Sequence, residues 1–587
     1  MQNIRGILAP LSWCLLILAG FLIHGASGHD DPHINFWFSH TLLEYGQLVN
    51  YNGDRVEQTT SLLLVLMTAL SGLLLPFDLV TCGYLVDVIS AFGCCWLITV
   101  LAKRFCPVVP VWPAILMLMS NSFMLWTFGG MGAVLAAFVV LCGAAVWWSY
   151  VESPRLGARQ YVSLAGVTFA LVLVRPEMPL IILACAISLL VLHAHDKKRR
   201  IRFLHIFLVS LSGFLLLLAW QKFYFSSWLP LPVMAKQAGE RSVLSRLDVG
   251  FFYLAVSSIF NPVVLLSALT IPVVIWRFFY RKPEKNADHV WSTPVLTLLL
   301  VLLIYVGAYC GFAWSSGGDW MQGGRFLVPV IPLSTLLVVI VSALLVRNKA
   351  VLHVVFLLLA VSGLFWLPGF VVRGSHGIPV WAQYRLNPAD DRYSIFEKYN
   401  QEHLRDMAVI GHLRDMIPSL YQQLGRPVRL LSGQAGMVFY TLGKEFYGQV
   451  QFSDFRGLVE GGYTTCPLLR NTRRNAMGLD WNYMQLFEMQ PALESVCNVQ
   501  QPDIVYDVNH TFYDVPTVFD QAGYALIHQE RGFVLVNKSA LGANRLLTPN
   551  LIFVRKDLLP LLDGRDGITL INYEDVPLKY RAENIWH

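Results

Sequence analysis

The sequence predicts an α-helical polytopic membrane domain followed by a smaller C-terminal α/β domain. Of the 587 residues, 55% are hydrophobic, and the mean hydropathy is +0.52. Charged residues make up 14% of the chain, whereas soluble domains contain about 25%. Apolar runs close to the roughly 20 residues that cross a bilayer recur from Ile7 to Phe370. These observations indicate a multi-pass protein of the lipid bilayer, and a net charge of only +6 gives no case for binding nucleic acid.

About eleven apolar segments are predicted to span the membrane. They cover residues 7–27, 80–102, 108–126, 131–150, 161–174, 178–194, 203–221, 251–276, 292–313, 326–346 and 350–370. A further apolar segment, 59–77, decides the topology. If it does not cross and the N-terminus is inside, the short Lys and Arg clusters between spans all face the cytoplasm, as the positive-inside rule requires. We therefore expect 59–77 to be an interfacial or re-entrant helix at the outer surface.

The two ends of the chain complete this organisation. Arg5, an apolar stretch and the small residues 25–28 resemble a signal peptide. We interpret the segment as an uncleaved first span, because cleavage would leave the acidic residues that follow it near a free end. Residues 1–370 are the predicted membrane domain. Residues 371–587 are the predicted extracytoplasmic α/β domain, with short β-like runs such as Val428–Leu431, Ile504–Tyr506 and Gly532–Val536.

Cysteine usage separates the two domains. Eight of the ten cysteines lie in or beside apolar segments, where cysteine usually behaves as a small hydrophobic residue. Cys466 and Cys497 lie in the polar tail, which this topology places in an oxidising compartment. We predict a disulfide between them; the alternative is two free buried thiols.

An adjacent pair of carboxylates, Asp30 and Asp31, follows the first apolar segment. Such a pair at the edge of a membrane is costly to place, which indicates a functional role; taken alone, the pair is equally compatible with a helix cap or a solvated loop. The other polar clusters on the predicted outer face contain Arg55, Glu57, Arg175, Glu177, Lys236, Asp319 and Arg325. The topology was assigned without these residues, so their convergence on one face indicates a functional surface.

Each cluster also has a purely structural interpretation. Arg175-Pro176-Glu177 is compatible with a helix hairpin and a local ion pair. Lys236 is compatible with a side chain that extends to the lipid headgroups. Gly317-Gly318 is compatible with a tight turn.

The residue types on this face indicate a class of chemistry. A carboxylate can take a proton from an acceptor hydroxyl, while Arg and Lys can hold a phosphate and stabilise it as it leaves. Glycine-rich loops let the backbone approach a ligand closely. A lipid-linked sugar phosphate requires all three. A transporter would instead need a site at the membrane midplane, where Asp87 is the main acid and has no basic partner nearby in sequence.

These residues and their order along the chain resemble a known family, the GT-C membrane glycosyltransferases. Within that family, the resemblance is to the mycobacterial terminal β-(1→2)-arabinofuranosyltransferases. The resemblance covers roughly residues 28–335, and the tail matches more weakly through Gly433–Gly436 and Gly457–Val459. The motifs that carry it are Asp30-Asp31-x-x-Ile34-x-Phe36, Gly53-x-Arg55-Val56-Glu57, Arg175-Pro176-Glu177, Leu229-Pro230 with Lys236, and Gly317-Gly318-Asp319-Trp320-Met321-x-Gly323-Gly324-Arg325-Phe326.

The resemblance implies an inverting transfer of a sugar, with arabinofuranose the best guess, from a decaprenyl- or undecaprenyl-phosphate donor to an extracytoplasmic acceptor. It implies a bacterial inner membrane location with a periplasmic C-terminal domain, and a catalytic base at Asp30 or Asp31. Arg175, Lys236 and Arg325 would grip the phosphate. Asp319 and Glu57 would orient sugar hydroxyls or arginine partners, and Arg55 and Glu177 are further substrate-binding candidates. A divalent cation at the acid pair is left open, since no ligand spacing requires one.

The chain departs from the family pattern in three places. Pro32 and His33 stand where the family has Ala and an aromatic residue, Trp37 stands for Arg, and residues 130–133 lack an expected acid. These departures bear on the sugar and the acceptor more than on the reaction type. Two other classes remain open: a transporter or flippase of lipid-linked sugars, and a non-catalytic envelope assembly protein that uses the tail for docking.

Overall fold

The structure is a computed structural model with two compact units. It describes residues 2–24, 30–237, 243–279, 292–319, 323–346, 348–365, 372–373, 385–386, 395–433, 435–454, 466, 468, 489–507, 523–529 and 551–562. The first unit, called the helical unit, comprises Met1–Ser27, Ser61–Trp220 and Ser242–Glu397. The second, called the mixed unit, comprises Gly28–Thr60, Gln221–Arg241 and Lys398–His587.

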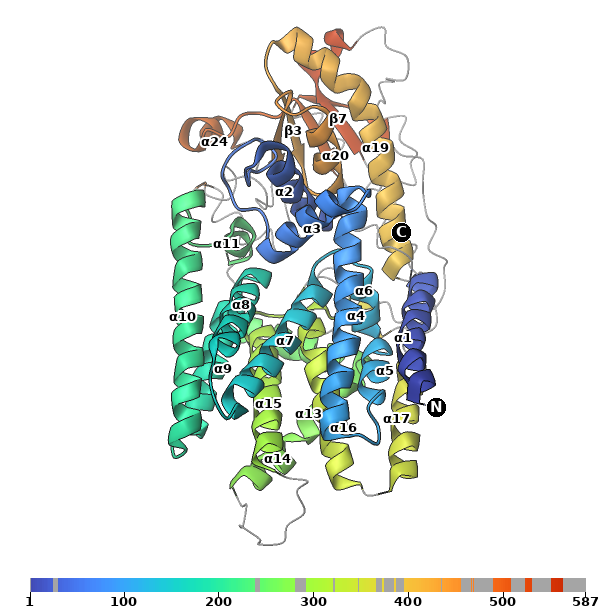
Figure 1. The fold of residues 1–587 in the computed structure, drawn as a ribbon. Coiled ribbons are helices and arrows are strands. Elements are labelled where there is room, and N and C mark those ends of the chain that lie inside the picture. Colours follow the sequence, from blue (N-terminus) through green and yellow to red (C-terminus); the bar gives the residue numbers. More distant parts are fainter. Residues whose placement is uncertain are drawn as a thin grey trace. The chain divides into compact units, whose positions relative to one another are not determined.

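The helical unit is built from apolar helices around a continuous hydrophobic core (Figure 1). Its elements are α1 (Gln2–His24), α3 (Leu62–Leu74), α4 (Leu79–Phe105), α5 (Trp112–Leu118), α6 (Asn121–Thr127), α7 (Ala133–Glu152), α8 (Ala158–Val174), α9 (Met178–Leu192), most of α10 (Lys197–Phe225), α12 (Val243–Phe260), α13 (Pro262–Leu269), α14 (Ile271–Phe279), α15 (Thr293–Ser315), η2 (Arg325–Val330), α16 (Ile331–Leu345) and α17 (Lys349–Phe365). A short β1–β2 pair (Val372–Arg373 with Arg385–Leu386) also belongs to it.

Six helical segments in the described part of the chain are long and apolar enough to cross a membrane. They are Leu79–Phe105, Ala133–Glu152, Lys197–Phe225, Pro262–Phe279, Thr293–Ser315 and Arg325–Leu345. Shorter apolar helices, such as α8 and α9, accompany them. The chain is therefore a membrane protein, while the number of spans stays a prediction.

Two of the predicted spans are interrupted. The 108–126 segment divides into α5 and α6, and the 251–276 segment divides into α12, α13 and α14. The break at Asn261 precedes Pro262, the first residue of α13. The proline ring disfavours helical geometry at the residue before it, so the sequence itself accounts for this break.

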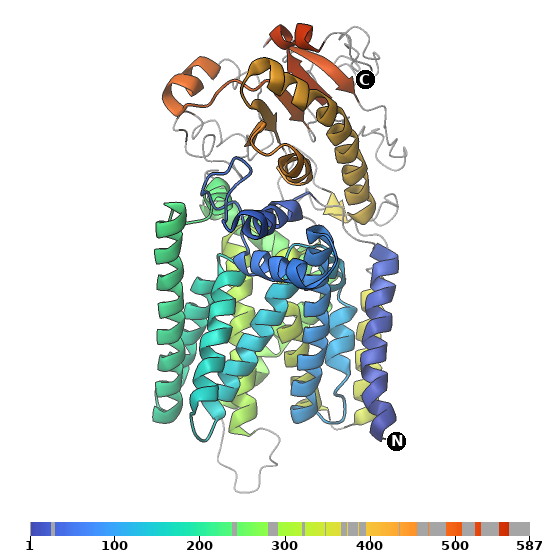
Figure 2. The same cartoon turned by 45° about the horizontal axis from the view of Figure 1, so that its top comes forward.

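The segment that decides the topology forms the short helix α3. With 13 residues and a rise of 1.5 Å per residue, it is about 20 Å long, whereas the hydrocarbon core is about 30 Å thick. In Figure 2, α3 runs across the axes of α4 and α7. Its length and direction support the prediction that 59–77 does not cross the membrane.

The mixed unit contains a five-stranded sheet. Its strands are β3 (Val428–Ser432), β4 (Val450–Asp454), β5 (Ile504–Asp507), β6 (Tyr524–Gln529) and β7 (Leu551–Arg555). They lie in the order β4-β3-β5-β7-β6; β3 pairs in parallel with β4 and β5, and β7 pairs antiparallel with β5 and β6. The predicted strands at Val428–Leu431 and Ile504–Tyr506 are confirmed, and Gly532–Val536 lies outside the described residues.

The helical elements of the mixed unit come from distant parts of the chain. They are α2 (Pro32–Tyr45), α11 (Leu231–Gln237), α19 (Ile395–Leu424), α20 (Met437–Glu445), α24 (Gln490–Cys497) and η3 (Lys556–Leu561). The loop before α3 is integrated with the sheet: the side chain of Asn52 donates to the carbonyl of Phe452 (2.8 Å) and accepts from its N–H (2.7 Å). Trp37 is fully buried, donates to the carbonyl of Val49 and lies 4.9 Å from the ring of Tyr51. This core position accounts for the aromatic residue at position 37.

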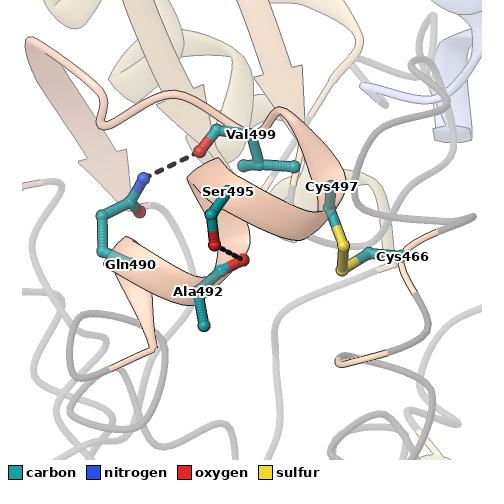
Figure 3. Close-up of a disulfide and its surroundings, with 6 residues drawn as sticks. All are labelled: Cys466, Gln490, Ala492, Ser495, Cys497 and Val499. Carbon is teal, nitrogen blue, oxygen red and sulfur yellow. Dashed lines mark hydrogen bonds between the residues drawn. A yellow bond between two sulfur atoms is a disulfide. The ribbon is translucent and has the colours of Figure 1, made fainter.

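The predicted disulfide between Cys466 and Cys497 is confirmed, with a Cα–Cα distance of 5.4 Å (Figure 3). Cys497 ends α24, whose first residue, Gln490, donates from its side chain to the carbonyl of Val499 (2.8 Å). The helix is therefore held at one end by a covalent bond and across its length by a hydrogen bond.

Candidate functional site

Arg175 and Glu177 lie in the turn between α8 and α9, where Pro176 separates the two helices. The Arg175 Nε donates to Glu177 Oε1, and the Tyr309 hydroxyl on α15 donates to the same oxygen at 3.1 Å. All three side chains are buried. The local ion pair expected from the sequence therefore exists, and it gains a partner, Tyr309, that the sequence did not indicate.

Asp319 and Arg325 form a second buried pair, at the two ends of the glycine-rich segment. Arg325 Nε donates to Asp319 Oδ2 (2.8 Å) and Nη2 donates to Oδ1 (3.1 Å). The two residues are 4% and 5% exposed. This is the parallel two-bond geometry in which Arg and carboxylate interact most strongly.

The glycines of this segment have a specific conformational role. Gly318 and Gly324 have φ values of +76° and +62°, in the region that glycine adopts without a steric penalty. A Cβ on Gly318 would lie 2.4 Å from the ring of Tyr253, and one on Gly324 would lie 2.8 Å from Ser122 Oγ. The predicted tight turn is present, and it brings the backbone close to its neighbours.

The two ion pairs belong to one cluster. The Arg175 guanidinium lies 5.4 Å from the centre of the Phe326 ring, and the Arg325 guanidinium lies 5.8 Å from the same centre. We call Arg175, Glu177, Asp319 and Arg325 the arginine–carboxylate cluster. Its charges sum to zero, and both guanidinium groups lie within cation–π distance of an aromatic ring.

A buried asparagine that the sequence analysis missed supports the segment before Arg325. Asn261 accepts from Ser120 Oγ (2.6 Å) and donates to Ser122 Oγ (2.7 Å). Ser120 precedes α6, and Trp126 on α6 donates from its indole to the carbonyl of Gly323 (3.0 Å). The Asn-Pro pair inside an apolar run was the available signal, because it marks the break between α12 and α13.

Asp87, the midspan acid, is a helix cap. Its Oδ2 accepts from the N–H of Gly132 and its Oδ1 from the N–H of Leu135, each at 3.0 Å. These N–H groups belong to the start of α7, where intrahelical acceptors are missing. This role requires no basic partner. Asp87, the main acid at the predicted membrane midplane, therefore has a structural explanation that does not involve transport.

In the mixed unit, Asp30 accepts two backbone hydrogen bonds at the start of α20. Gly436 N donates to Oδ2 (2.9 Å) and Met437 N donates to Oδ1 (2.5 Å). Asp30 is 5% exposed. Burial, together with the negative charges of Asp406 and Asp31, raises the pKa of Asp30 well above its usual value, and the two N–H donors offset part of that rise.

Glu57 is another buried acid of the mixed unit. Its Oε2 accepts from the side-chain amide of Gln221 at 3.0 Å. Burial raises the pKa of Glu57 to about 8, while the hydrogen bond from Gln221 lowers it in part. Arg55, two residues earlier, is exposed, and its guanidinium lies 5.0 Å from the ring centre of Tyr224.

The structure thus gathers four predicted residues in the arginine–carboxylate cluster and assigns Asp30, Asp31, Arg55 and Glu57 to the mixed unit. Lys236 lies in α11, but its side chain is outside the described residues. In the described part of the chain, no three His, Cys, Asp or Glu side chains are grouped so as to hold a metal ion.

Comparisons with known proteins identify a fold class. No family model and no curated protein matches the chain. Among solved structures, the archaeal oligosaccharyltransferase AglB from Archaeoglobus fulgidus, determined with an inhibitory peptide and a dolichol-phosphate, has a TM-score of 0.52 and 12% identity. That match covers all of this chain and 78% of AglB. ArnT from Cupriavidus metallidurans, determined with undecaprenyl phosphate, has a TM-score of 0.47 and 11% identity, over 94% of this chain and 98% of ArnT.

Both neighbours are membrane glycosyltransferases of the GT-C superfamily. At 12% identity, the match to AglB shows the fold alone. The fold of this protein is therefore similar to that of a GT-C membrane enzyme.

Proposed function

We propose that the protein is an inverting membrane glycosyltransferase. It moves a sugar, with arabinofuranose the best guess, from a polyprenyl-phosphate donor to an extracytoplasmic acceptor glycan, lipid or protein. The observation that carries the proposal is the arginine–carboxylate cluster, in which a glycine-rich segment and a helix turn bring two buried guanidinium groups to one aromatic ring. The fold shared with AglB, whose structure includes a dolichol-phosphate, supports it.

A structural role alone explains this cluster poorly. Removing two charges from water costs several kcal/mol per ion, so buried ion pairs contribute little net stability. The Arg guanidinium group, by contrast, matches the geometry of phosphate as well as carboxylate. Asp319 uses Arg325 Nε and Nη2, and Nη1 makes no hydrogen bond to any described residue. That nitrogen is available to a phosphate oxygen.

The reaction needs three functions. An aspartate of the Asp30–Asp31 pair takes the proton of the acceptor hydroxyl, and the resulting oxygen attacks the anomeric carbon from the face opposite the phosphate. The bond between that carbon and the phosphate oxygen breaks, and the electron pair leaves with the polyprenyl phosphate. Arg175, Arg325 and Lys236 stabilise the departing phosphate, and Asp319 and Glu57 orient sugar hydroxyls or arginine partners.

The proposal includes a bacterial inner membrane location with about eleven spans, and places both the acid pair and the 371–587 domain in the periplasm. Cysteine-accessibility labelling tests this arrangement. A cysteine at Ser316 should react from outside and one at Lys198 only from inside; the opposite pattern would overturn it.

Turnover of radiolabelled polyprenyl-phosphate sugars by the purified protein tests the activity. We expect transfer to an added acceptor from at least one pentose donor, with decaprenyl- and undecaprenyl-phosphate arabinofuranose as the first substrates, in the presence and absence of Mg²⁺. Movement of the intact donor across a proteoliposome membrane without chemical conversion would identify a flippase instead. No conversion of any donor would contradict the proposal.

A further inference from the structure

Asp30 is bound more firmly than a general base requires. Both carboxylate oxygens are used by consecutive backbone N–H groups at the start of α20, and its own carbonyl accepts from the N–H of His33 at 3.1 Å. A helix start has N–H groups without intrahelical acceptors, and a negative charge is favourable there. Asp30 therefore caps a helix that lies more than 400 positions away in the sequence.

The approach of the two chain segments is very close. A Cβ on Gly436 would lie 2.0 Å from the backbone carbonyl oxygen of Asp30 and 2.5 Å from its carboxyl carbon. No side chain larger than hydrogen fits at position 436 unless the contact opens. Gly436 thus provides a way to disturb the contact without altering any ionisable group.

Asp31 is held differently. It is half-buried, and within the described residues its side chain makes no capping hydrogen bond to α2, although it is the residue before that helix. The chain is fixed on both sides of it, by the Asp30 contact and by Pro32, whose ring restricts φ. Two fixed neighbours limit the directions in which the Asp31 carboxylate can point.

We propose that Asp30 is a positioning residue, which binds the start of α20 and so fixes the backbone at Asp31, and that Asp31 is the general base. This division of roles rests on the proposed glycosyl transfer. This division of roles also gives Pro32, a departure from the family pattern, a function: with the Asp30 contact, it restrains the backbone on either side of Asp31.

The test compares the pH dependence of turnover in four variants. Asp31→Asn should lower kcat by at least about a hundredfold and remove the acidic limb of the profile. Asp30→Asn keeps one oxygen acceptor and should lower kcat by roughly tenfold at most, with the acidic limb retained. Asp30→Ala keeps neither acceptor and should lose more, roughly ten- to hundredfold, because the start of α20 is then left without either hydrogen bond.

Gly436→Ala is the matched variant, since it disturbs the same contact and leaves both carboxylates in place. It should reproduce the loss of kcat seen in Asp30→Ala while retaining the acidic limb. If Asp30 were the base, Asp30→Asn and Asp30→Ala would be equally inactive and would both lose the limb, while Asp31→Asn would be nearly normal. That result would overturn the inference.

Hydrogen exchange at α20 provides a readout that does not depend on activity. The amides of Gly436 and Met437 should exchange faster in Asp30→Ala and Gly436→Ala than in the wild type, and at the wild-type rate in Asp31→Asn. Equal protection in all variants would overturn the positioning role. If the wild-type protein transferred no sugar from any donor, the proposed function would fail, while the exchange data would still decide whether Asp30 holds α20.

Discussion

The candidate site carboxylates of the two units have different partners. In the helical unit, Glu177 and Asp319 are each paired with an arginine, Arg175 and Arg325 respectively. The charges compensate each other within the cluster.

In the mixed unit, the donors to Asp30 and Glu57 that the structure describes are neutral. They are two backbone N–H groups and the side-chain amide of Gln221. Neutral donors leave the cost of burying the charge largely uncompensated, so burial raises the pKa of both acids, and the negative charges of Asp406 and Asp31 raise that of Asp30 further.

This difference separates two kinds of chemistry. A carboxylate paired with arginine can fix the geometry of the guanidinium group. A carboxylate in a neutral setting can gain or lose a proton near neutral pH. We therefore expect the arginine–carboxylate cluster to respond to the geometry of its charges, and Glu57 to respond to pH.

The largest expected effect comes from Arg325. Arg325→Ala would leave Asp319 as a buried charge without its cation, which typically costs about 3–5 kcal/mol. Arg325→Lys keeps the charge but loses the two parallel hydrogen bonds, so we expect donor binding and turnover to fall by roughly tenfold or more. Donor titration and the unfolding temperature in detergent measure the two effects.

Arg414→Lys is the matched control for Arg325→Lys. Arg414 makes the same Nε and Nη2 contacts to a carboxylate, that of Glu445, but the two side chains are 42% and 34% exposed. An exposed pair contributes about 1 kcal/mol at most. If both Arg→Lys variants behaved like the wild type, the two parallel hydrogen bonds of the buried pair would matter no more than those of the surface pair. The prediction for Arg325 would then be wrong.

The second prediction concerns the pH dependence of stability through Glu57. Its pKa of about 8 in the folded protein lies above the ordinary value of 4.5. Between these pH values the native state holds a proton that the unfolded chain has released. The stabilisation is therefore complete below about pH 4.5 and is lost as the pH rises to about 8, by up to about 5 kcal/mol.

Glu57→Gln removes this titration. We expect the stability of the wild type relative to Glu57→Gln to fall between pH 5 and pH 9, as measured by thermal unfolding in detergent. Parallel stability curves over this range would show that Glu57 titrates near its ordinary value. The assumption that its neighbours are neutral would then be wrong.

The sequence predicted those features that depend on nearby residues. Arg175 and Glu177 are two positions apart, and Asp319 and Arg325 are six apart, so a turn or a short loop is enough to pair them. The apolar spans and the strands at 428–431 and 504–506 follow from local composition in the same way. The prediction of a disulfide succeeded because only two cysteines lie outside the apolar segments.

The missed contacts join distant segments. Asp30 binds Gly436 across 406 positions, and Glu57 binds Gln221 across 164. No local pattern indicates such a partner, because the contact exists only after the chain has folded. The sequence could therefore select the acid pair as a candidate site but could not divide the roles proposed for its two residues.

The smallest expected effect sharpens the description of the helical unit. Tyr309→Phe removes the hydroxyl that donates to Glu177 Oε1 at 3.1 Å and leaves the Arg175–Glu177 pair in place. Glu177 keeps its hydrogen bond from Arg175, so we expect donor KM to rise only several-fold, with a smaller change in kcat. Tyr305 is the matched control: it lies one turn earlier on α15, is fully buried, and its hydroxyl has no hydrogen-bond partner among the described residues. Tyr305→Phe should leave KM and stability nearly unchanged. Equal effects of the two substitutions would show that Tyr309 acts by packing alone and that Arg175 and Glu177 do not depend on a third group.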